Sequence, residues 1–402
     1  MASRTATRRS RSQRRPAPPA RRGRGTSAGA GKAAGEAPYR ARQQRLAAAV
    51  AEAGASHLLI THPKDVAYLT GFLGGDSYLL LSAPGNTPTR PVLLSDFRYQ
   101  EELEPVRAAG LADLFIRPRS MLEAVVEVVR GAKVDRLGIQ AEHMTVALRR
   151  SIEEKLGTAV VETNGLLPAL RTIKDQTEIA LIRRAVRIQE QALEAVLPTI
   201  RPGQTELEIA GRLEAEMKAR GSSAPGFETI IAVGPHGSLP HYRPGTTKVA
   251  SGKPLLIDWG AIYSGYHSDM TRTLAIGRWN PKVREIYRIV LEAQEMAAAA
   301  LAPGRTTAEI DAIARDHIRA AGYGDYFGHG LGHGFGLEGK EEPYLTNMLA
   351  PTVLRPGQIV TVEPGIYLPG VGGVRIEDDY VITDRGAANL CSLPKDLDWA
   401  TR

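Results

Sequence analysis

Short apolar runs alternate with amphipathic stretches along the first part of the chain. The runs have the length of buried strands, and the stretches between them carry apolar residues at helical spacing. The clearest runs are residues 57–61, 78–81 and 91–94, and the clearest helical stretches are residues 42–53 and 120–130. This alternation predicts an α/β domain over residues 41–165. The segment contains neither a glycine-rich phosphate loop nor a cluster of metal ligands, so we expect it to contribute shape rather than chemistry.

A longer helix is predicted to link this domain to the rest of the chain. Asp175 and Glu178 have the spacing of a capping box, apolar residues follow at helical spacing, and Pro198 ends the pattern. We therefore expect a helix over residues 175–197, near the start of a second domain that spans residues 170–395.

The second domain repeats itself at an offset of 101 residues. Its first half contains Pro202, Gly203, Thr205, Glu208 and Gly221, which return as Pro303, Gly304, Thr306, Glu309 and Gly322. Each half thus predicts a Pro-Gly turn, a helix with a capping box, a glycine stop and a following pair of strands. The duplication predicts an α+β domain with pseudo-two-fold symmetry, and ligand sites favour the interface between such halves.

The net charge of +7 belongs to the N-terminal tail. Residues 1–35 contain ten Arg and Lys residues and no acid, so the remaining chain carries a net charge of −3. The tail, residues 1–40, has few apolar side chains to bury, which predicts disorder. A solvated extension is the first interpretation, and a polyanion-binding arm and a targeting peptide are the alternatives. Nucleic-acid contact is therefore expected at most as a weak polyanion contact of the tail.

The distribution of apolar residues and the cysteine content bear on the compartment. No run of about 18 apolar residues could span a bilayer, and no apolar stretch follows the tail arginines as a secretory signal would require. Cys391 is the single cysteine, so an internal disulfide is excluded. These features predict a cytoplasmic protein without a membrane span.

Four acidic residues lie at or near the strands expected in the two halves. They are Asp258 and Asp269 in the first half and Glu363 and Glu377 in the second. In a β-hairpin, the spacing of each pair can bring both carboxylates onto one face. Four unpaired charges on inward-facing strands would be very unfavourable, and two divalent cations would cancel them.

A glycine-rich segment, residues 328–336, contains His329 and His333, and His333 is the expected nitrogen ligand. Taken singly, each acid is more often a turn or salt-bridge residue, and each histidine is more often structural. Together, in order on both halves of a repeat, they predict a metal site. Carboxylates with one imidazole suit Mn²⁺, Co²⁺, Fe²⁺ or Zn²⁺ in a two-metal centre.

These motifs resemble those of the pita-bread metallopeptidases, the family of aminopeptidase P and prolidase. In the second domain the resemblance rests on Leu256-Ile257-Asp258-Trp259-Gly260-Ala261, Gly265-Tyr266-His267-Ser268-Asp269-Met270-Thr271-Arg272-Thr273, the His329/His333 segment, Val362-Glu363-Pro364-Gly365 and Gly373-Val374-Arg375-Ile376-Glu377-Asp378. In the first domain it rests on Val66-Ala67-Tyr68-Leu69-Thr70-Gly71-Phe72 and Leu94-Ser95-Asp96-Phe97-Arg98-Tyr99, which are similar to the creatinase-type N-terminal domain, a ribonuclease H-like fold. Methionine aminopeptidases share the catalytic fold but lack that domain, so they fit less well.

The resemblance implies an exopeptidase that hydrolyses the Xaa-Pro bond of proline-containing peptides by attack of a metal-bridging hydroxide. It implies a homodimer and two divalent metal ions, with Mn²⁺ expected first and Co²⁺, Fe²⁺ or Zn²⁺ as alternatives. The implied metal ligands are Asp258, Asp269, His333, Glu363 and Glu377, with Asp269 and Glu377 as the bridging carboxylates. The implied catalytic residues are His241, Glu363 and Lys340, and the implied substrate-binding residues are His329, Tyr367 and Arg375.

Lys340 departs from the family pattern, because it stands where relatives usually carry a second catalytic histidine. An imidazole with a pKa of about 6.5 exchanges protons at neutral pH, whereas an ammonium with a pKa of about 10.4 does not. Lys340 and the basic tail favour one alternative, a peptidase-like binding protein with weak or no turnover. A creatinase-like C–N hydrolase is another, against which the complete ligand set argues. The sequence leaves open whether the substrate is a dipeptide or a longer peptide.

Overall fold

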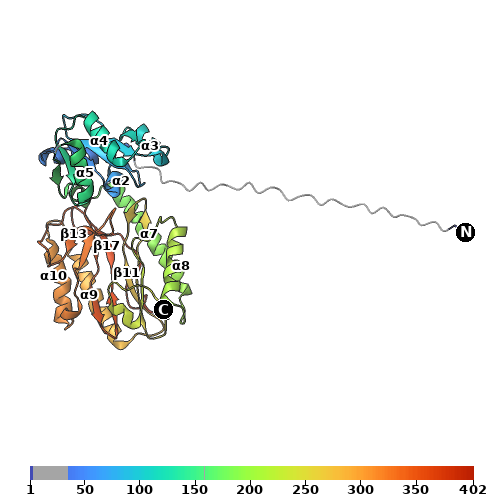
Figure 1. The fold of residues 1–402 in the computed structure, drawn as a ribbon. Coiled ribbons are helices and arrows are strands. Elements are labelled where there is room, and N and C mark those ends of the chain that lie inside the picture. Colours follow the sequence, from blue (N-terminus) through green and yellow to red (C-terminus); the bar gives the residue numbers. More distant parts are fainter. Residues whose placement is uncertain (3–34, 158) are drawn as a thin grey trace. The chain divides into compact units, whose positions relative to one another are not determined.

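The computed structural model describes residues 1–2, 35–157 and 159–402 (Figure 1). Residues 36–402 form one unit by their contacts, separate from residues 1–35. The disorder predicted for the tail falls mainly on residues 3–34, outside the described residues. Helix α1 (Glu36–Glu52) begins inside the segment predicted as tail. None of the helices in the described part of the chain combines the length and the apolar content that a bilayer span requires.

The N-terminal domain is built on a mixed sheet with the strand order β4-β3-β2-β1-β5-β6. The strands are β1 (His57–Ile60), β2 (Tyr78–Ser82), β3 (Val92–Ser95), β4 (Asp113–Ile116), β5 (Leu137–Gln140) and β6 (Val161–Thr163). Strand β1 pairs antiparallel with β2 and parallel with β5, and all four of its residues are buried. Leu58 and Ile60 pack into one apolar cluster and Leu59 into another, so both faces of the sheet are covered.

Helices pack on this sheet. Besides α1 they are α2 (Pro63–Thr70), α3 (Glu104–Ala108), α4 (Met121–Gly131) and α5 (Val146–Leu156), with the short 3₁₀ turn η1 (Phe97–Tyr99). Two of them, α1 and α4, correspond to the helical stretches that the apolar spacing predicts. Helix α4 begins after Ser120, whose hydroxyl forms a capping box with Glu123. The predicted alternation of strands and helices in this domain is confirmed.

The linking helix is also confirmed. Helix α7 (Gln176–Val196) follows α6 (Leu166–Thr172) and ends in the 3₁₀ turn η2 (Leu197–Thr199). The Asp175 side chain accepts hydrogen bonds from the backbone N–H groups of Thr177 and Glu178, and the Glu178 carboxylate closes the capping box. One face of α7 is apolar and buried, so the helix joins the cores of the two domains.

The second domain contains two sheets of matching topology. The first half has the order β11-β8-β7, and the second half has the order β13-β12-β14-β17-β18. The strands are β7 (Ile230–Val233), β8 (Pro254–Asp258), β11 (Thr271–Ala275), β12 (Gly332–Gly334), β13 (Glu341–Leu345), β14 (Ile359–Val362), β17 (Asp378–Ile382) and β18 (Ala387–Asn389), with the hairpins β9 (Ile262–Tyr263)/β10 (Tyr266–His267) and β15 (Gly365–Leu368)/β16 (Gly372–Arg375). Strands β11, β8 and β7 correspond in order to β17, β14 and β12, and each half inserts one hairpin at the equivalent place. The predicted duplication is thus present in the topology.

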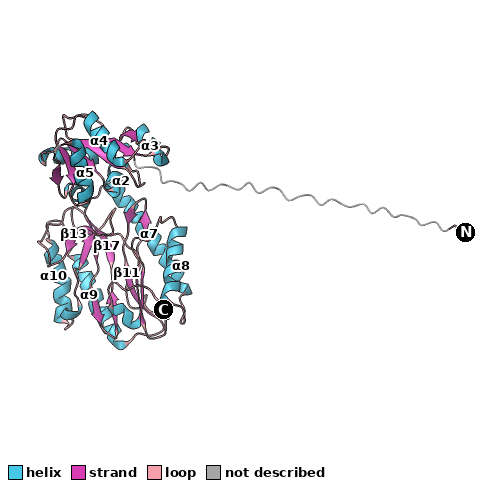
Figure 2. Cartoon of the chain, in the orientation of Figure 1, coloured by secondary structure: helices cyan, strands magenta, loops and turns pink. Residues whose placement is uncertain are grey.

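Helices lie on the outside of these sheets, as Figures 1 and 2 show. They are α8 (Glu206–Ala219), α9 (Pro281–Ala299) and α10 (Thr307–Ala320), with the 3₁₀ turns η3 (Gly234–Ser238) and η4 (Gly324–Tyr326). The capping boxes predicted at Thr205/Glu208 and Thr306/Glu309 are both formed, and they start α8 and α10. Helix α8 packs on β7, α10 packs on β13, and α9 contacts β14, β15 and β16. The polar residues of the site lie on or beside the strands of these sheets.

Candidate metal centre

The first half contributes two carboxylates, one on each side of a hairpin. Asp258 is the last residue of β8, and Asp269 lies two residues before β11. The hairpin β9–β10 lies between them, with Gly265 in its turn at a φ of +84°. Strands β8 and β11 are therefore not joined by the simple hairpin that the spacing suggested. Both acids nevertheless lie at the same end of the pair, where Asp258 is opposite Thr271.

The second half repeats this arrangement. Glu363 directly follows β14, Glu377 directly precedes β17, and the hairpin β15–β16 lies between them. Val362 is paired with Asp378 in the β14–β17 ladder, so both acids lie at one edge of the sheet. The backbone N–H of Glu377 donates a hydrogen bond to the carbonyl oxygen of Thr271 over 3.1 Å. This bond joins the two halves directly at the site.

His333 is the middle residue of β12 and lies between two glycines. A Cβ atom added to Gly332 would lie 2.1 Å from the Thr361 carbonyl oxygen, and one added to Gly334 would lie 2.4 Å from the Glu342 carbonyl oxygen. These glycines allow the neighbouring strands to approach β12 closely. The close packing of strands fixes the position of the histidine.

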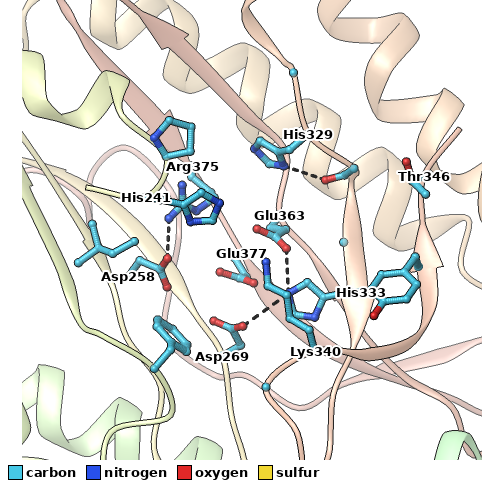
Figure 3. A pocket seen from close by; sticks show the side chains of 18 of the residues that line it. His241, Asp258, Asp269, His329, His333, Lys340, Thr346, Glu363, Arg375 and Glu377 are labelled. Atoms are coloured by element: carbon cyan, nitrogen blue, oxygen red, sulfur yellow. Dashed lines mark hydrogen bonds and ion pairs between the residues drawn. The ribbon is translucent and has the colours of Figure 1, made fainter. Parts of the chain in front are cut away.

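The five predicted ligands converge in one cavity (Figure 3). Asp258, Asp269 and Glu377 each offer an oxygen within 4.8 Å of the other two. Nε2 of His333 lies 3.3 Å from Oε1 of Glu363 and 3.8 Å from Oδ2 of Asp269. All five side chains are largely buried. The structure therefore brings together residues that are up to 119 positions apart in the sequence.

Burial raises the pKa of all four carboxyl groups. The pKa values of Asp269 and Glu377 lie well above their ordinary range, because burial and then the neighbouring carboxylates disfavour ionisation. Burial raises the pKa of Glu363 to about 7, although the Arg375 guanidinium opposes the shift. The pKa of Asp258 is raised by the same cause and opposed by the same guanidinium. Full ionisation of the four groups therefore requires additional positive charge at the site.

Two further observations fit divalent cations as that charge. Oδ1 of Asp258 is buried and has no hydrogen-bond partner among the described residues, which is unfavourable for an acceptor unless something binds it. Nδ1 of His333 lies 3.0 Å from the Gly334 carbonyl oxygen. Donation of its proton there leaves the lone pair on Nε2, facing the carboxylates. Burial lowers the pKa of His333 to about 4, so the ring is neutral at pH 7, as a ligand must be.

The three predicted substrate-binding residues form a chain of hydrogen bonds that ends at Asp258. Nη2 of Arg375 donates to Oδ2 of Asp258 over 2.5 Å, and Nη1 donates to the Tyr367 hydroxyl over 2.9 Å. Nε2 of His329 lies 2.8 Å from the Tyr367 hydroxyl, and Nδ1 lies 2.8 Å from the Gly330 carbonyl oxygen. Burial lowers the pKa of His329 to about 4, so the neutral ring accepts from Tyr367 and donates to Gly330. These hydrogen bonds together orient the Asp258 carboxylate.

A cavity of about 850 Å³ opens above these residues and is lined by both remaining predicted catalytic residues, His241 and Lys340. His241 belongs to the loop after η3, and Lys340 belongs to the turn between β12 and β13; both side chains are exposed. The rest of the wall is mainly apolar or aromatic and includes Phe227, Tyr344 and Leu349. The cavity has the size expected for a small-ligand site.

Two threonines at the site were missed in the sequence. Thr271 donates a hydrogen bond from Oγ1 to Oε2 of Glu377 over 2.6 Å and accepts one from Nε of Arg375 over 3.0 Å. Thr361 accepts a hydrogen bond from the backbone N–H of His333 over 3.1 Å, and its hydroxyl lies 3.3 Å from Oε1 of Glu363. Each threonine is two residues from an acid, which places both side chains on one face of an extended segment. That spacing was the available sign of their role.

The turn that carries Lys340 is held by residues of the first domain and the linker. Glu338 forms an ion pair with Lys64 of α2, and Glu341 forms ion pairs with Arg171 of α6 and Lys174. Burial alone would raise the pKa of Glu341, but these two cations lower it to about 2. Lys340 therefore lies between two anchored acids, and the first domain contributes more to the site than shape.

Comparison with known proteins agrees with this geometry. Residues 180–384 match metallopeptidase family M24, and residues 42–173 match the creatinase/prolidase N-terminal domain. The chain is 36% identical over 359 residues to the Xaa-Pro dipeptidase of Pyrococcus furiosus, covering 89% of this chain and 99% of that protein. It is similar to the solved structure of the Xaa-Pro dipeptidase from Bacillus anthracis, with a TM-score of 0.84, 37% identity and coverage of 89% of this chain and 99% of that one. The X-Pro aminopeptidase from Thermotoga maritima gives a TM-score of 0.79 at 33% identity, covering 85% of this chain and 97% of that one. The chain belongs to metallopeptidase family M24, and a creatinase/prolidase N-terminal domain precedes its catalytic domain.

Proposed function

We propose that the protein is a dinuclear-metal exopeptidase that hydrolyses Xaa-Pro bonds. The observation that carries the proposal is the convergence of four buried carboxylates and the free Nε2 of His333 at the base of one cavity. Two divalent cations would be held by Asp258, Asp269, His333, Glu363 and Glu377. Mn²⁺ is the first expectation, since oxygen ligands with a single imidazole suit it. The Xaa-Pro specificity rests on the relatives, two of which are named as Xaa-Pro dipeptidases and one as an X-Pro aminopeptidase.

Divalent cations bound here would polarise the scissile carbonyl group and lower the pKa of a bound water. Side chains of the protein would transfer the proton, stabilise the oxyanion and contact the substrate. Glu363 would receive a proton and pass it to the leaving imino nitrogen of proline. Lys340 would donate a charged hydrogen bond to the carbonyl oxygen as negative charge develops on it. His241 would contact the substrate from the loop after η3, which lines the cavity.

Product analysis tests this function. The protein is dialysed against a chelator, reloaded with Mn²⁺ and incubated with Ala-Pro and with a longer peptide that begins Ala-Pro. Cleavage of the dipeptide alone identifies a dipeptidase, and release of alanine from both identifies an aminopeptidase. A control peptide with alanine in place of proline should be cleaved much more slowly.

Lys340 favours a second candidate, a peptidase-like protein that binds peptides without turnover, because it stands where relatives usually carry a second catalytic histidine. If neither the parent nor Lys340→His cleaves any Xaa-Pro peptide with Mn²⁺ bound, this candidate replaces the first.

A further inference from the structure

A buried carboxylate outside the metal centre holds one wall of the cavity. Glu206 is the first residue of α8, and its side chain is fully buried. Its Oε1 accepts a hydrogen bond from the backbone N–H of Val233 over 2.8 Å and lies 3.0 Å from Nδ1 of His236. Its Oε2 accepts from the Tyr242 hydroxyl over 2.8 Å and from the backbone N–H of Gly245 over 2.9 Å. One side chain thus binds four groups along residues 233–245.

That segment, which we call the His241 loop, carries His241 toward the cavity. The His241 side chain is exposed, so close packing does not fix its position, and the path of the loop backbone must do so. Tyr242 is the next residue, and its ring stacks on His236 with centroids 4.3 Å apart. Glu206 binds both of these neighbouring side chains. It therefore anchors the loop immediately beside His241.

The duplication shows that this carboxylate is not a general requirement of the fold. At the equivalent position of the second half, 101 residues later, stands Thr307. Its hydroxyl accepts one hydrogen bond, from the backbone N–H of Thr352 over 3.1 Å. In both halves the helix start also pairs through its backbone with a following loop, Glu206 with Thr247 and Thr307 with Thr352. A threonine suffices to attach a loop there, and the carboxylate occurs in the half whose loop lines the cavity with a histidine.

A carboxylate suits this place because it is an acceptor at both oxygens. The four donors satisfy it in the absence of a metal ion, and hydrogen bonds to an ionised acceptor are stronger than neutral ones. An amide in its place would keep one acceptor oxygen and would direct an NH₂ group at donors of the loop. The donors on that side, the Val233 N–H with His236 or the Gly245 N–H with Tyr242, would then lose their partner, which is unfavourable.

We propose that Glu206 is a positioning residue, which holds the His241 loop and thereby sets His241 in the cavity. The catalytic part of this inference rests on the function proposed above, and the structural part does not.

Glu206→Gln, loaded with Mn²⁺, tests both parts against Glu208→Gln. Glu208 lies two residues later on the same helix, and its carboxylate caps the backbone N–H of Thr205 without touching the loop. We expect Glu206→Gln to raise amide hydrogen exchange at Val233 or Gly245, whichever faces the NH₂ group of the new side chain. We expect it to lower kcat/KM on Ala-Pro by at least about tenfold, since a misplacement of about 1 Å can cost ~100-fold. Glu208→Gln should leave exchange at these two amides and kcat/KM near the parent values.

Parent-like exchange and kcat/KM in Glu206→Gln would overturn the inference, and so would equal losses in Glu208→Gln, because these would reflect helix stability alone. If the parent cleaves no Xaa-Pro peptide, the proposed function fails, and the exchange measurement still decides whether Glu206 holds the loop. If Glu206→Gln does not fold, Tyr242→Phe removes a single donor and keeps the carboxylate. It should raise exchange at Gly245 and lower kcat/KM about threefold, consistent with one hydrogen bond of about 0.5–1.5 kcal/mol; parent-like exchange would contradict the proposal.

Discussion

Asp269 and Glu377 occupy matching positions in the two halves, each shortly before the strand that follows the inserted hairpin. Burial, and then neighbouring carboxylates, raise the pKa of both, with Asp258 foremost among the carboxylates for Asp269 and Asp269 foremost for Glu377. A pair of buried acids this close is tolerable only if the charge is neutralised, either by protons or by cations. The protonated and the cation-bound forms of the pair differ in metal content and in the dependence of stability on pH.

Asp269→Asn and Glu377→Gln should each abolish hydrolysis and lower the bound metal, because an amide cannot supply the negative charge of the lost ligand. The loss should exceed the ~100-fold cost typical of changes in residues that only support a ligand. Metal content after gel filtration and kcat/KM on Ala-Pro measure the two effects. Asp316→Asn, an exposed acid of α10, serves as the control and should behave as the parent. Parent-like activity in either site variant would end the two-metal interpretation.

Removal of the metal should make the stability fall with pH above neutrality. The ordinary pKa of Glu363 is 4.5 and its folded value is about 7, while Asp269 and Glu377 are raised well above their ordinary values. Above pH 6.5 the unfolded chain has released these protons and the folded chain still holds part of them, so a rise in pH favours unfolding. The free energy of unfolding of the metal-free protein should therefore decline between about pH 6.5 and 8.5.

Urea unfolding after dialysis against a chelator measures this decline. The range starts at pH 6.5 because the buried histidines, whose pKa values are lowered, raise the stability with pH below that value. Glu377→Gln should flatten the decline, since it removes one of the groups that must ionise. Saturation with Mn²⁺ should also flatten it, because the cations displace the protons. A metal-free protein whose stability rises over this range would contradict the assignment of raised pKa values.

Lys340→Ala should lower kcat/KM on Xaa-Pro peptides, and Lys340→His should raise it. Loss of one donor to a developing oxyanion costs about 100-fold or more in kcat. The lysine stem holds its donor less rigidly than a ring does, and an imidazole can exchange protons near pH 7. Steady-state kinetics of the three proteins at saturating Mn²⁺ give the answer. If Lys340→Ala matches the parent, the lysine takes no part in the reaction.

At the scale of elements, β12 depends on residues without side chains. A Cβ atom at Gly332 would lie 2.1 Å from a backbone oxygen of β14, which cannot move aside as a flexible side chain does. Gly332→Ala should therefore separate the two strands, reduce stability by about 1–3 kcal/mol as overpacking does, and lower the metal content by displacing His333. Gly328→Ala is the matched control from the same segment, because a Cβ there meets nothing within 4 Å. Equal metal content and equal melting temperatures in the two variants would refute this account.

The elements that could be predicted from the sequence are those with local causes. The capping boxes at Asp175, Thr205 and Thr306 start the helices that they predict, because a cap depends on residues three positions apart. The repeat at an offset of 101 residues predicts the matching halves, because each half carries its own Pro-Gly turn and its own capping box. Helix α1 begins at Glu36, before the predicted start at residue 42. Glu36 and the residues after it carry no apolar pattern that shows where the helix begins.

The features that escaped prediction depend on contacts between distant segments. The acid spacings indicated hairpins, but the inserted pairs β9–β10 and β15–β16 could not be inferred from them. The order of the four acids and His333 on the two halves of the repeat predicts a metal site, and the family resemblance implies the role of each ligand. The hydrogen bonds of Glu206 join α8 to a loop up to 39 residues away, and nothing in the local sequence marks a buried carboxylate in the first turn of a helix.

At the scale of the whole molecule, the two domains meet at the turn that carries Lys340. The Lys64–Glu338 pair is partly exposed, with 39% and 33% of the side chains accessible, so it is worth about 0.5–1 kcal/mol. If the ion pair stabilises the turn in its reactive position by this energy, Lys64→Glu or Glu338→Lys alone should lower kcat/KM about twofold to fivefold. The combined exchange should restore most of the activity, because the opposite charges face each other again.

A double-mutant cycle on kcat/KM and on the melting temperature measures this coupling. The exposed Arg90–Asp113 pair of the same domain is the matched control, and its exchange should change neither quantity appreciably. A combined Lys64/Glu338 variant no better than the worse single variant would show that this ion pair does not orient the turn.

The division of the four carboxylates between two similar halves has a further consequence. A single half of the second domain would hold one pair of acids and would complete the site only by pairing with a copy of itself across a two-fold axis. Such a symmetric cleft presents the same groups from both sides, so a peptide would bind equally well in either direction. Two joined halves are free of this constraint, and here the two sides differ: β12 alone brings His333, and α8 alone brings the carboxylate behind His241. The molecule can therefore distinguish the amino end of a peptide from its carboxyl end, which the removal of a terminal residue demands.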